Sequence, residues 1–204
     1  MRFIVYPLSL IIICAACTKK RDSVNQSPKD SVKTTTAPVD DSAIIEQQSV
    51  EDDKKGSLKA KATATLGTTH INIAYYSPAV RGRIIWGGLV PFDKVWVTGA
   101  HSATSIEFNQ DLVIASKTIA AGKYAFFTIP GKEEWTIILN KNWHQHLTDR
   151  YDEKEDVLRV NVKPEVKEKN QERLRYVIEK VSESDGKLVM YWEKIEVSLP
   201  FKIK

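Results

Sequence analysis

Alternation of apolar and polar residues, which begins near residue 57 and recurs to the end of the chain, constrains the fold of this sequence most. From Leu58 to Leu66 every second residue is apolar, and the alternation resumes from Ile71 to Tyr75 after a break at Gly67. Successive side chains of a β-strand point to opposite faces of the sheet, so a period of two predicts a strand. The two runs with the glycine between them predict a β-hairpin.

Further short runs of strand-forming residues follow, separated by turn residues. We expect these strands at residues 95–98, 104–109, 112–115, 117–119, 124–129, 135–139, 157–162, 173–181 and 187–197, and a shorter one at 83–86. Asp185-Gly186, between the last two long runs, is a strong hairpin signal. The charged run Glu165–Arg173 is expected to be a solvated loop or a short helix. About nine or ten mostly antiparallel strands without a long helix predict an all-β fold, a β-sandwich or a Greek-key barrel.

The first residues have the features of a signal peptide at 1–16. Arg2 supplies the positive start, and an apolar run follows that is too short to span a bilayer. The sequence Cys14-Ala15-Ala16-Cys17 resembles the lipobox of bacterial lipoproteins, in which the cysteine after the small residues is lipidated and becomes the new N-terminus. An ordinary secretory signal that contains two cysteines is the alternative. We favour lipidation of Cys17, because the mature sequence holds no other cysteine with which it could pair.

A polar segment at residues 17–56 separates this signal from the alternating runs. It is rich in Lys, Asp, Ser, Thr, Gln and Pro, with only scattered apolar residues. Such a segment buries too little apolar surface to offset the loss of chain entropy, so we expect a disordered tether. The expected organisation is a signal peptide at 1–16, a tether at 17–56 and a single β domain at 57–204.

Cysteine content and charge exclude several classes of function. If Cys14 leaves with the signal peptide and Cys17 carries lipid, the β domain has no thiol. Disulfides, a cysteine nucleophile and thiolate metal sites are then excluded. The net charge of +4 is small and its two signs are interleaved along the chain. Because nucleic-acid-binding domains show a basic stripe or patch, we expect no nucleic-acid partner.

Three histidines are candidate metal ligands. His101 follows Gly99-Ala100, and His144 and His146 lie on a long polar segment that also carries Asp149 and Asp152. In an extended chain a His-x-His pair points both rings the same way, which suits a divalent metal with a nearby carboxylate. The alternative is that these histidines are exposed on a polar loop. No cofactor other than such a metal is expected.

Aromatic and cationic residues of the irregular segments suggest a binding pocket. Aromatic faces beside carboxylate and amide groups suit a sugar or peptide groove, whereas hydrophobic plugs beneath a loop are the alternative. Arg81 and Arg83 flank Gly82, where they would bind an anion or form ion pairs with acidic loops. The candidate pocket residues are His101, Trp143, His144, His146, Arg150, Tyr151, Asp152, Arg83 and Trp86.

Catalytic signatures are otherwise missing from the sequence. It contains no His-Glu-x-x-His zinc-protease motif, no nucleophile elbow and no phosphate-binding loop. Ser102, His101 and Asp152 contain the residue types of a hydrolytic triad, but their spacing does not support one.

Several short motifs, in order, resemble a bacterial family named domain of unknown function 2911. They are Ser77-Pro78, Gly82-Arg83, Gly88–Phe92, Val95-Trp96, Thr98–Ala100, Ala103-Thr104, Ala121–Tyr124, Phe127–Gly131, Glu134–Ile137, Asn140-Lys141, Asp156–Val160 and Val162–Pro164. The resemblance covers about residues 58–204 and implies a mostly β, envelope-associated domain. Val97, His101 and Ser102 stand where the family commonly has Arg, Asn and Glu.

Together these features predict a lipid-anchored protein of the cell envelope. Many lipoproteins that stay in the inner membrane have an aspartate after the lipidated cysteine, whereas this chain has Lys19-Lys20 there. By resemblance to other lipoproteins we therefore expect attachment to the outer membrane through Cys17. Its β domain would be a binding or structural module for a carbohydrate, a peptide or another envelope protein. A metal-assisted hydrolase of the envelope that uses the histidine cluster is the alternative.

Overall fold

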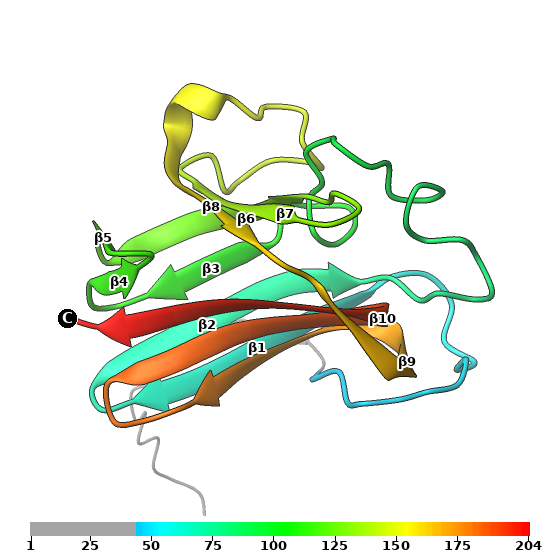
Figure 1. The fold of residues 1–204 in the computed structure, drawn as a ribbon, viewed down its shortest axis with the longest axis horizontal. Coiled ribbons are helices and arrows are strands. Elements are labelled where there is room, and N and C mark those ends of the chain that lie inside the picture. The colour runs from blue at the N-terminus through cyan, green and yellow to red at the C-terminus, as the bar shows by residue number, and fades with distance from the viewer. Residues whose placement is uncertain (1–43) are drawn as a thin grey trace, which may run out of the picture. The chain divides into compact units, whose positions relative to one another are not determined.

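The computed structural model describes residues 44–204 (Figure 1). The expected signal peptide, Cys17 and most of the expected tether lie outside the described residues. Within residues 44–204 no helix is long and apolar enough to cross a membrane.

The described chain is all-β, as the alternation predicts. Its strands are β1 (Leu58–Leu66), β2 (Thr69–Ser77), β3 (Ser105–Phe108), β4 (Leu112–Ile114), β5 (Lys117–Ile119), β6 (Gly122–Ile129), β7 (Trp135–Asn140), β8 (Asp156–Val162), β9 (Glu165–Lys180) and β10 (Asp185–Ile203). A 3₁₀ turn, η1 (Glu153–Glu155), precedes β8.

The strands form two antiparallel sheets that pack face to face. One sheet has the order β1-β2-β3-β6-β7-β8 and the other the order β5-β4-β10-β9 (Figure 1). The main core lies between them, and its largest fully buried apolar side chains include Trp135, Trp192, Phe108 and Phe126. This arrangement is the expected β-sandwich.

The first hairpin follows the predicted register. Leu58 pairs with Ser77 and Leu66 with Thr69, so the alternate apolar residues of both strands face the core. Gly67 has a φ of +56°, the left-handed conformation that a tight turn requires and that glycine adopts without steric cost.

The last two strands form the expected hairpin, but Asp185-Gly186 is not its turn. The turn lies at residues 181–184, and Asp185 instead caps it by accepting hydrogen bonds from the hydroxyls of Ser182 (2.6 Å) and Ser184 (3.1 Å). Gly186 already belongs to β10, where a Cβ would come within 2.4 Å of the Phe201 ring. The glycine therefore serves close packing and not the turn.

β10 reverses direction within its length. A straight strand of its 19 residues would be about 60 Å long. However, the Ile203 amide, at one end of β10, donates a hydrogen bond to the Ser184 carbonyl, just before the other end (2.7 Å). The chain turns near Glu193, which has a φ of +56°, and Figure 1 shows the red end of β10 returning beside its orange beginning.

Two other expectations are corrected. The charged run Glu165–Arg173 is neither loop nor helix but the first part of β9, because its backbone pairs with β10 and Lys167 forms an ion pair with Glu196 (2.7 Å). Residues 95–98 and 83–86 do not form strands. Trp96 makes only an isolated bridge to Thr128, and Trp86 makes one to Val90.

Residues 44–56, which the polar composition placed in the tether, lie against β9. Their carboxylate and main-chain carbonyl groups accept hydrogen bonds from Arg173, whose side chain is buried in β9 and must be hydrogen-bonded there. Ordered structure therefore begins before residue 57. We call residues 44–56 the strap.

Candidate functional site

Two irregular segments, residues 95–103 and 141–152, cover the outer surface of β6 and β7. They enclose a second, smaller core made of Val97, Ala103, Ala125, Phe127 and Ile138. The ring of Tyr151 packs edge-on against Phe127 with 5.5 Å between centroids. We call residues 141–152 the loop cover.

The two segments are joined by main-chain hydrogen bonds. The Leu147 amide donates to the His101 carbonyl (2.7 Å), and the Ala103 amide donates to the Gln145 carbonyl (3.0 Å). Ser102 and His146 form an isolated antiparallel bridge. His101 is far from the loop cover along the chain, and the fold therefore brings the two directly side by side.

The three histidines do not form a metal-binding group. The His146 ring pairs with the Asp149 carboxylate (2.9 Å), and both side chains are exposed. The His101 ring instead lies edge-on to Tyr76, with 5.1 Å between centroids. Across residues 44–204, no cluster of three or more His, Cys, Asp or Glu side chains is placed to hold a metal ion.

Trp143 borders a hollow on the outer surface of the six-stranded sheet. The hollow has a volume of about 160 Å³, and its lining includes Tyr76, Ser102, Trp143 and His144. The indole of Trp143 is 38% exposed, which is high for tryptophan. The Lys123 ammonium lies 4.1 Å from the centroid of the ring system, in cation–π contact.

A second hollow continues over the same surface. It has a volume of about 430 Å³ and is lined by polar side chains of β1, β2, β3 and the start of β6. Ladder pairs place these side chains in rows, with Asn72 opposite Glu107 and Glu107 opposite Lys123. We call this surface the open face; its outward side chains are Lys59, Lys61, Thr63, Thr65, His70, Asn72, Ala74, Tyr76, Glu107 and Lys123.

Three other candidate residues anchor the loop cover. The Tyr151 hydroxyl donates to Asp156 (2.8 Å) and accepts from Arg159 (2.9 Å). Burial, together with the neighbouring Asp156 carboxylate, raises the pKa of Tyr151 to about 12. Asp152 caps η1 by accepting from the Lys154 amide (3.0 Å), and the Arg150 amide donates to the Gln145 side chain (2.9 Å).

Arg83 and Trp86 lie away from the open face. Arg83 donates to the carbonyls of Val80 and Ala79, and it lines a separate hollow of about 220 Å³ with Arg81. Trp86 belongs to a cluster of indoles in the main core, with centroids 4.8 Å from Trp135 and 5.7 Å from Trp192. The aromatic residues of the irregular segments thus divide into an exposed Trp143, a Tyr151 that anchors a loop and a Trp86 that packs in the core.

The sequence provides no specific signal for the other side chains of the open face. Asn72 and Tyr76 occupy polar-phase positions of an alternating strand, and Glu107 and Lys123 do the same on other strands. Period two assigns them to the outer surface, but it does not show which strands are neighbours. The sheet order β1-β2-β3-β6 brings them together.

Comparison with protein families gives one match. The family model described as "Protein of unknown function (DUF2911)" matches residues 57–201. Searches of curated proteins and of solved structures gave no match.

Proposed function

The chain belongs to the family described as protein of unknown function DUF2911, and from this premise we propose that its β-sandwich is a carbohydrate-binding module of the cell envelope. The open face binds a linear saccharide, and Trp143 supplies the platform on which one sugar ring stacks. The observation that carries this proposal is the exposed indole at the end of a polar sheet surface.

The chemistry of the open face suits a saccharide. A sugar ring presents a face of C–H groups, which packs on an aromatic ring, and a rim of hydroxyls, which needs hydrogen-bond donors and acceptors. Trp143 and Tyr76 line one hollow, while Asn72, Glu107 and Lys123 line the next. The Asn72 amide donates and accepts hydrogen bonds, the Glu107 carboxylate accepts them and the Lys123 ammonium donates them. The volumes of the two hollows together offer room for more than one sugar unit.

Association with the envelope is supported by the N-terminal sequence. The lipobox-like Cys14-Ala15-Ala16-Cys17 would place lipid on Cys17 and anchor the chain in the outer membrane. Several acyl chains on one cysteine hold a protein stably in a bilayer. The binding module would then act on a polymer close to the membrane surface, without a cofactor.

Titration with oligosaccharides of β-1,4-linked N-acetylglucosamine tests the binding proposal. We expect saturable binding by calorimetry and a change in tryptophan fluorescence, both lost in Trp143→Ala. Leu147→Ala is the matched control, because Leu147 lies on the same loop cover and is also 38% exposed. Equal binding by Trp143→Ala and the wild type would contradict the proposed platform.

Mass spectrometry of the mature protein tests the anchor. We expect an acylated N-terminal residue 17 and recovery in the outer-membrane fraction, and we expect Cys17→Ser to appear in the soluble fraction. An unmodified Cys17 in the membrane-free extract would contradict the anchor without affecting the binding proposal.

A further inference from the structure

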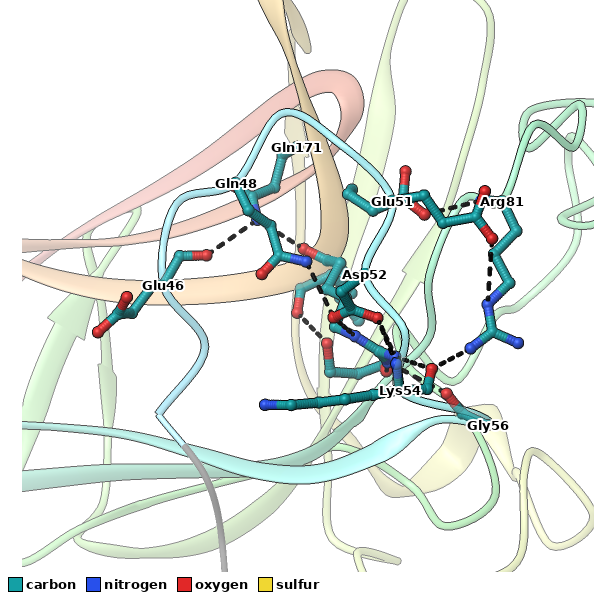
Figure 2. A network of polar contacts seen from close by, with 12 residues as sticks. Glu46, Gln48, Glu51, Asp52, Lys54, Gly56, Arg81 and Gln171 are labelled. Carbon is teal, nitrogen blue, oxygen red and sulfur yellow. Dashed lines mark hydrogen bonds and ion pairs between the residues drawn. The ribbon is translucent and has the colours of Figure 1, made fainter.

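The strap is held by polar contacts and by little apolar burial. Ile45 is buried, but Ile44 and Val50 are each 72% exposed. The strap lies along β9, the last strand in the order of the four-stranded sheet (Figure 2). At the same place the main chain of β9 also pairs with residues 78–80.

Donors of β9 bind the main-chain carbonyls of the strap. The Glu172 amide donates to the Gln48 carbonyl (2.9 Å), in the manner of a strand pair. Side chains make the other contacts: Gln171 to Glu46 O (3.2 Å), Asn170 to Ser49 O (3.3 Å), Arg175 to Ile45 O (3.1 Å), and Arg173 to Lys54 O (2.6 Å) and Gly56 O (3.1 Å). Every peptide has such carbonyls, so these contacts do not depend on sequence.

One contact does depend on sequence. Arg173 is 1% exposed, and its guanidinium holds the Asp52 carboxylate through two hydrogen bonds of 2.6 and 2.8 Å. The Gln48 side chain also donates to Asp52 (3.1 Å). The Arg173 guanidinium keeps the pKa of Asp52 well below its usual range. A two-pronged pair of this kind selects a carboxylate at one position.

The strap does not fill the groove in which it lies. A hollow of about 440 Å³ adjoins Gln47 and is lined mainly by polar side chains of β9 and β10, among them Lys167, Lys169, Arg175 and Tyr191. The groove therefore has unoccupied polar volume next to the bound main chain, where larger side chains of another peptide fit.

We propose that β9 carries a binding groove for extended peptides that contain an acidic residue, and that the strap is its resident occupant, which a partner peptide displaces. The donors of the groove lie within the residues that match the family, 57–201, whereas the strap lies outside them. Arg173 is the group that recognises the acidic residue, and the carbonyl contacts align the main chain. Recognition is mainly by side-chain donors of β9 that bind main-chain carbonyls of the peptide. It is independent of the open face.

Binding of a labelled peptide with the sequence of residues 44–56 tests this inference on the full chain. In the wild type the strap competes with the labelled peptide for the groove. In Asp52→Ala the strap has lost its ion pair with Arg173, so it competes less. Because a smaller occupied fraction raises the apparent affinity, we expect the variant to bind the peptide at least about ten-fold tighter in fluorescence anisotropy. A peptide with Asp52→Asn should not bind, whereas one with the neighbouring Asp53→Asn, an exposed position with the same charge change, should bind like the unaltered peptide.

A second measurement does not need a strap variant. An excess of peptide in which Lys54 and Lys55 are replaced by Gln, so that trypsin does not cleave it, should displace the strap of the wild type. Displacement should increase the rate of tryptic cleavage of the chain after Lys54, whose carbonyl bonds to Arg173 when the strap is in place. An Asp52→Ala protein that is folded by circular dichroism but binds the peptide no more tightly than the wild type would overturn the inference. So would a cleavage rate that excess peptide leaves unchanged.

Discussion

Two segments cover sheet surfaces of this domain, and they differ in how much an apolar contact contributes to holding them. The loop cover packs the Tyr151 ring against Phe127 in the second core and is also joined to residues 95–103 by main-chain hydrogen bonds. The strap is fixed to β9 by hydrogen bonds and by the Arg173–Asp52 ion pair. An apolar contact depends on shape and buried area, and it changes little with pH or with a competing ion. A polar contact is exchangeable, because another group of the same charge can replace it. From this difference we expect the loop cover to stay in place and the strap to be exchangeable.

The largest expected effect is in the core beneath the loop cover. Phe127→Ala removes a fully buried ring and should lower the free energy of unfolding by about 3–5 kcal/mol. Urea denaturation measures this change, and Leu147→Ala on the exposed side of the loop should stay within about 0.5 kcal/mol of the wild type. A loss below about 1 kcal/mol in Phe127→Ala would show that the loop cover is not held by this core.

A smaller loss is expected when the strap is released. Asp52→Asn removes the negative partner of a buried arginine, which costs about 3–5 kcal/mol when both partners are fully buried. The Asp52 side chain is 22% exposed, so we expect about 2 kcal/mol from urea denaturation. The matched control, Asp53→Asn, should have little effect. Equal stability of the two variants would show that the ion pair does not hold the strap.

The pH dependence of stability should also separate the two covers. The pKa of Asp52 is lower in the folded chain than in the unfolded chain, where it is near the ordinary value of 3.8. This contribution is therefore fully present above the unfolded pKa and is lost as the pH falls below it toward the folded pKa. When thermal denaturation is measured from about pH 6 down to about pH 3, the wild type should lose more stability than Asp52→Asn. Phe127→Ala should lose as much stability as the wild type over the same range. Parallel curves for the wild type and Asp52→Asn would contradict this assignment.

The smallest effect is expected from the polar contacts of the loop cover. Tyr151→Phe keeps the ring on Phe127 but removes the hydroxyl that bonds to Asp156 and Arg159. The net contribution of such a hydrogen bond is about 1 kcal/mol, and urea denaturation should show a loss of this size. A loss as large as that of Asp52→Asn would weaken the contrast between an apolar and a polar cover.

Local patterns predicted most of the strands, but not every turn or every extended segment. Alternation identified the hairpin of β1 and β2, because the period of two depends only on which face of a strand is buried. It did not identify the first part of β9, since charged side chains on an edge strand stay in solvent or pair across strands, as Lys167 and Glu196 do. Asp185-Gly186 carried a turn signal, but Gly186 is needed because Phe201 packs against its backbone.

The candidate site was predictable in part for the same reason. Trp143 and the histidines were identifiable as aromatic and polar residues of irregular segments. Grouping His101 with the loop cover in one candidate pocket followed from no local pattern, because Ser102 and His146 meet through a bridge between segments far apart in the chain. The strap was missed because polar composition predicts that a segment cannot form its own core. It does not show that a buried arginine elsewhere needs that segment as a partner.

By itself, the sequence determined the all-β class, the family resemblance and which side chains of each strand face the core, because these properties are local or depend on a short period. Only the tertiary structure decided which strands are neighbours, that four indoles gather in the main core, and that Arg173 bonds to Asp52. The physical reason is that sheet order and buried ion pairs join residues far apart in the chain. These contacts contribute to the free energy of folding only when both partners are buried at the same place.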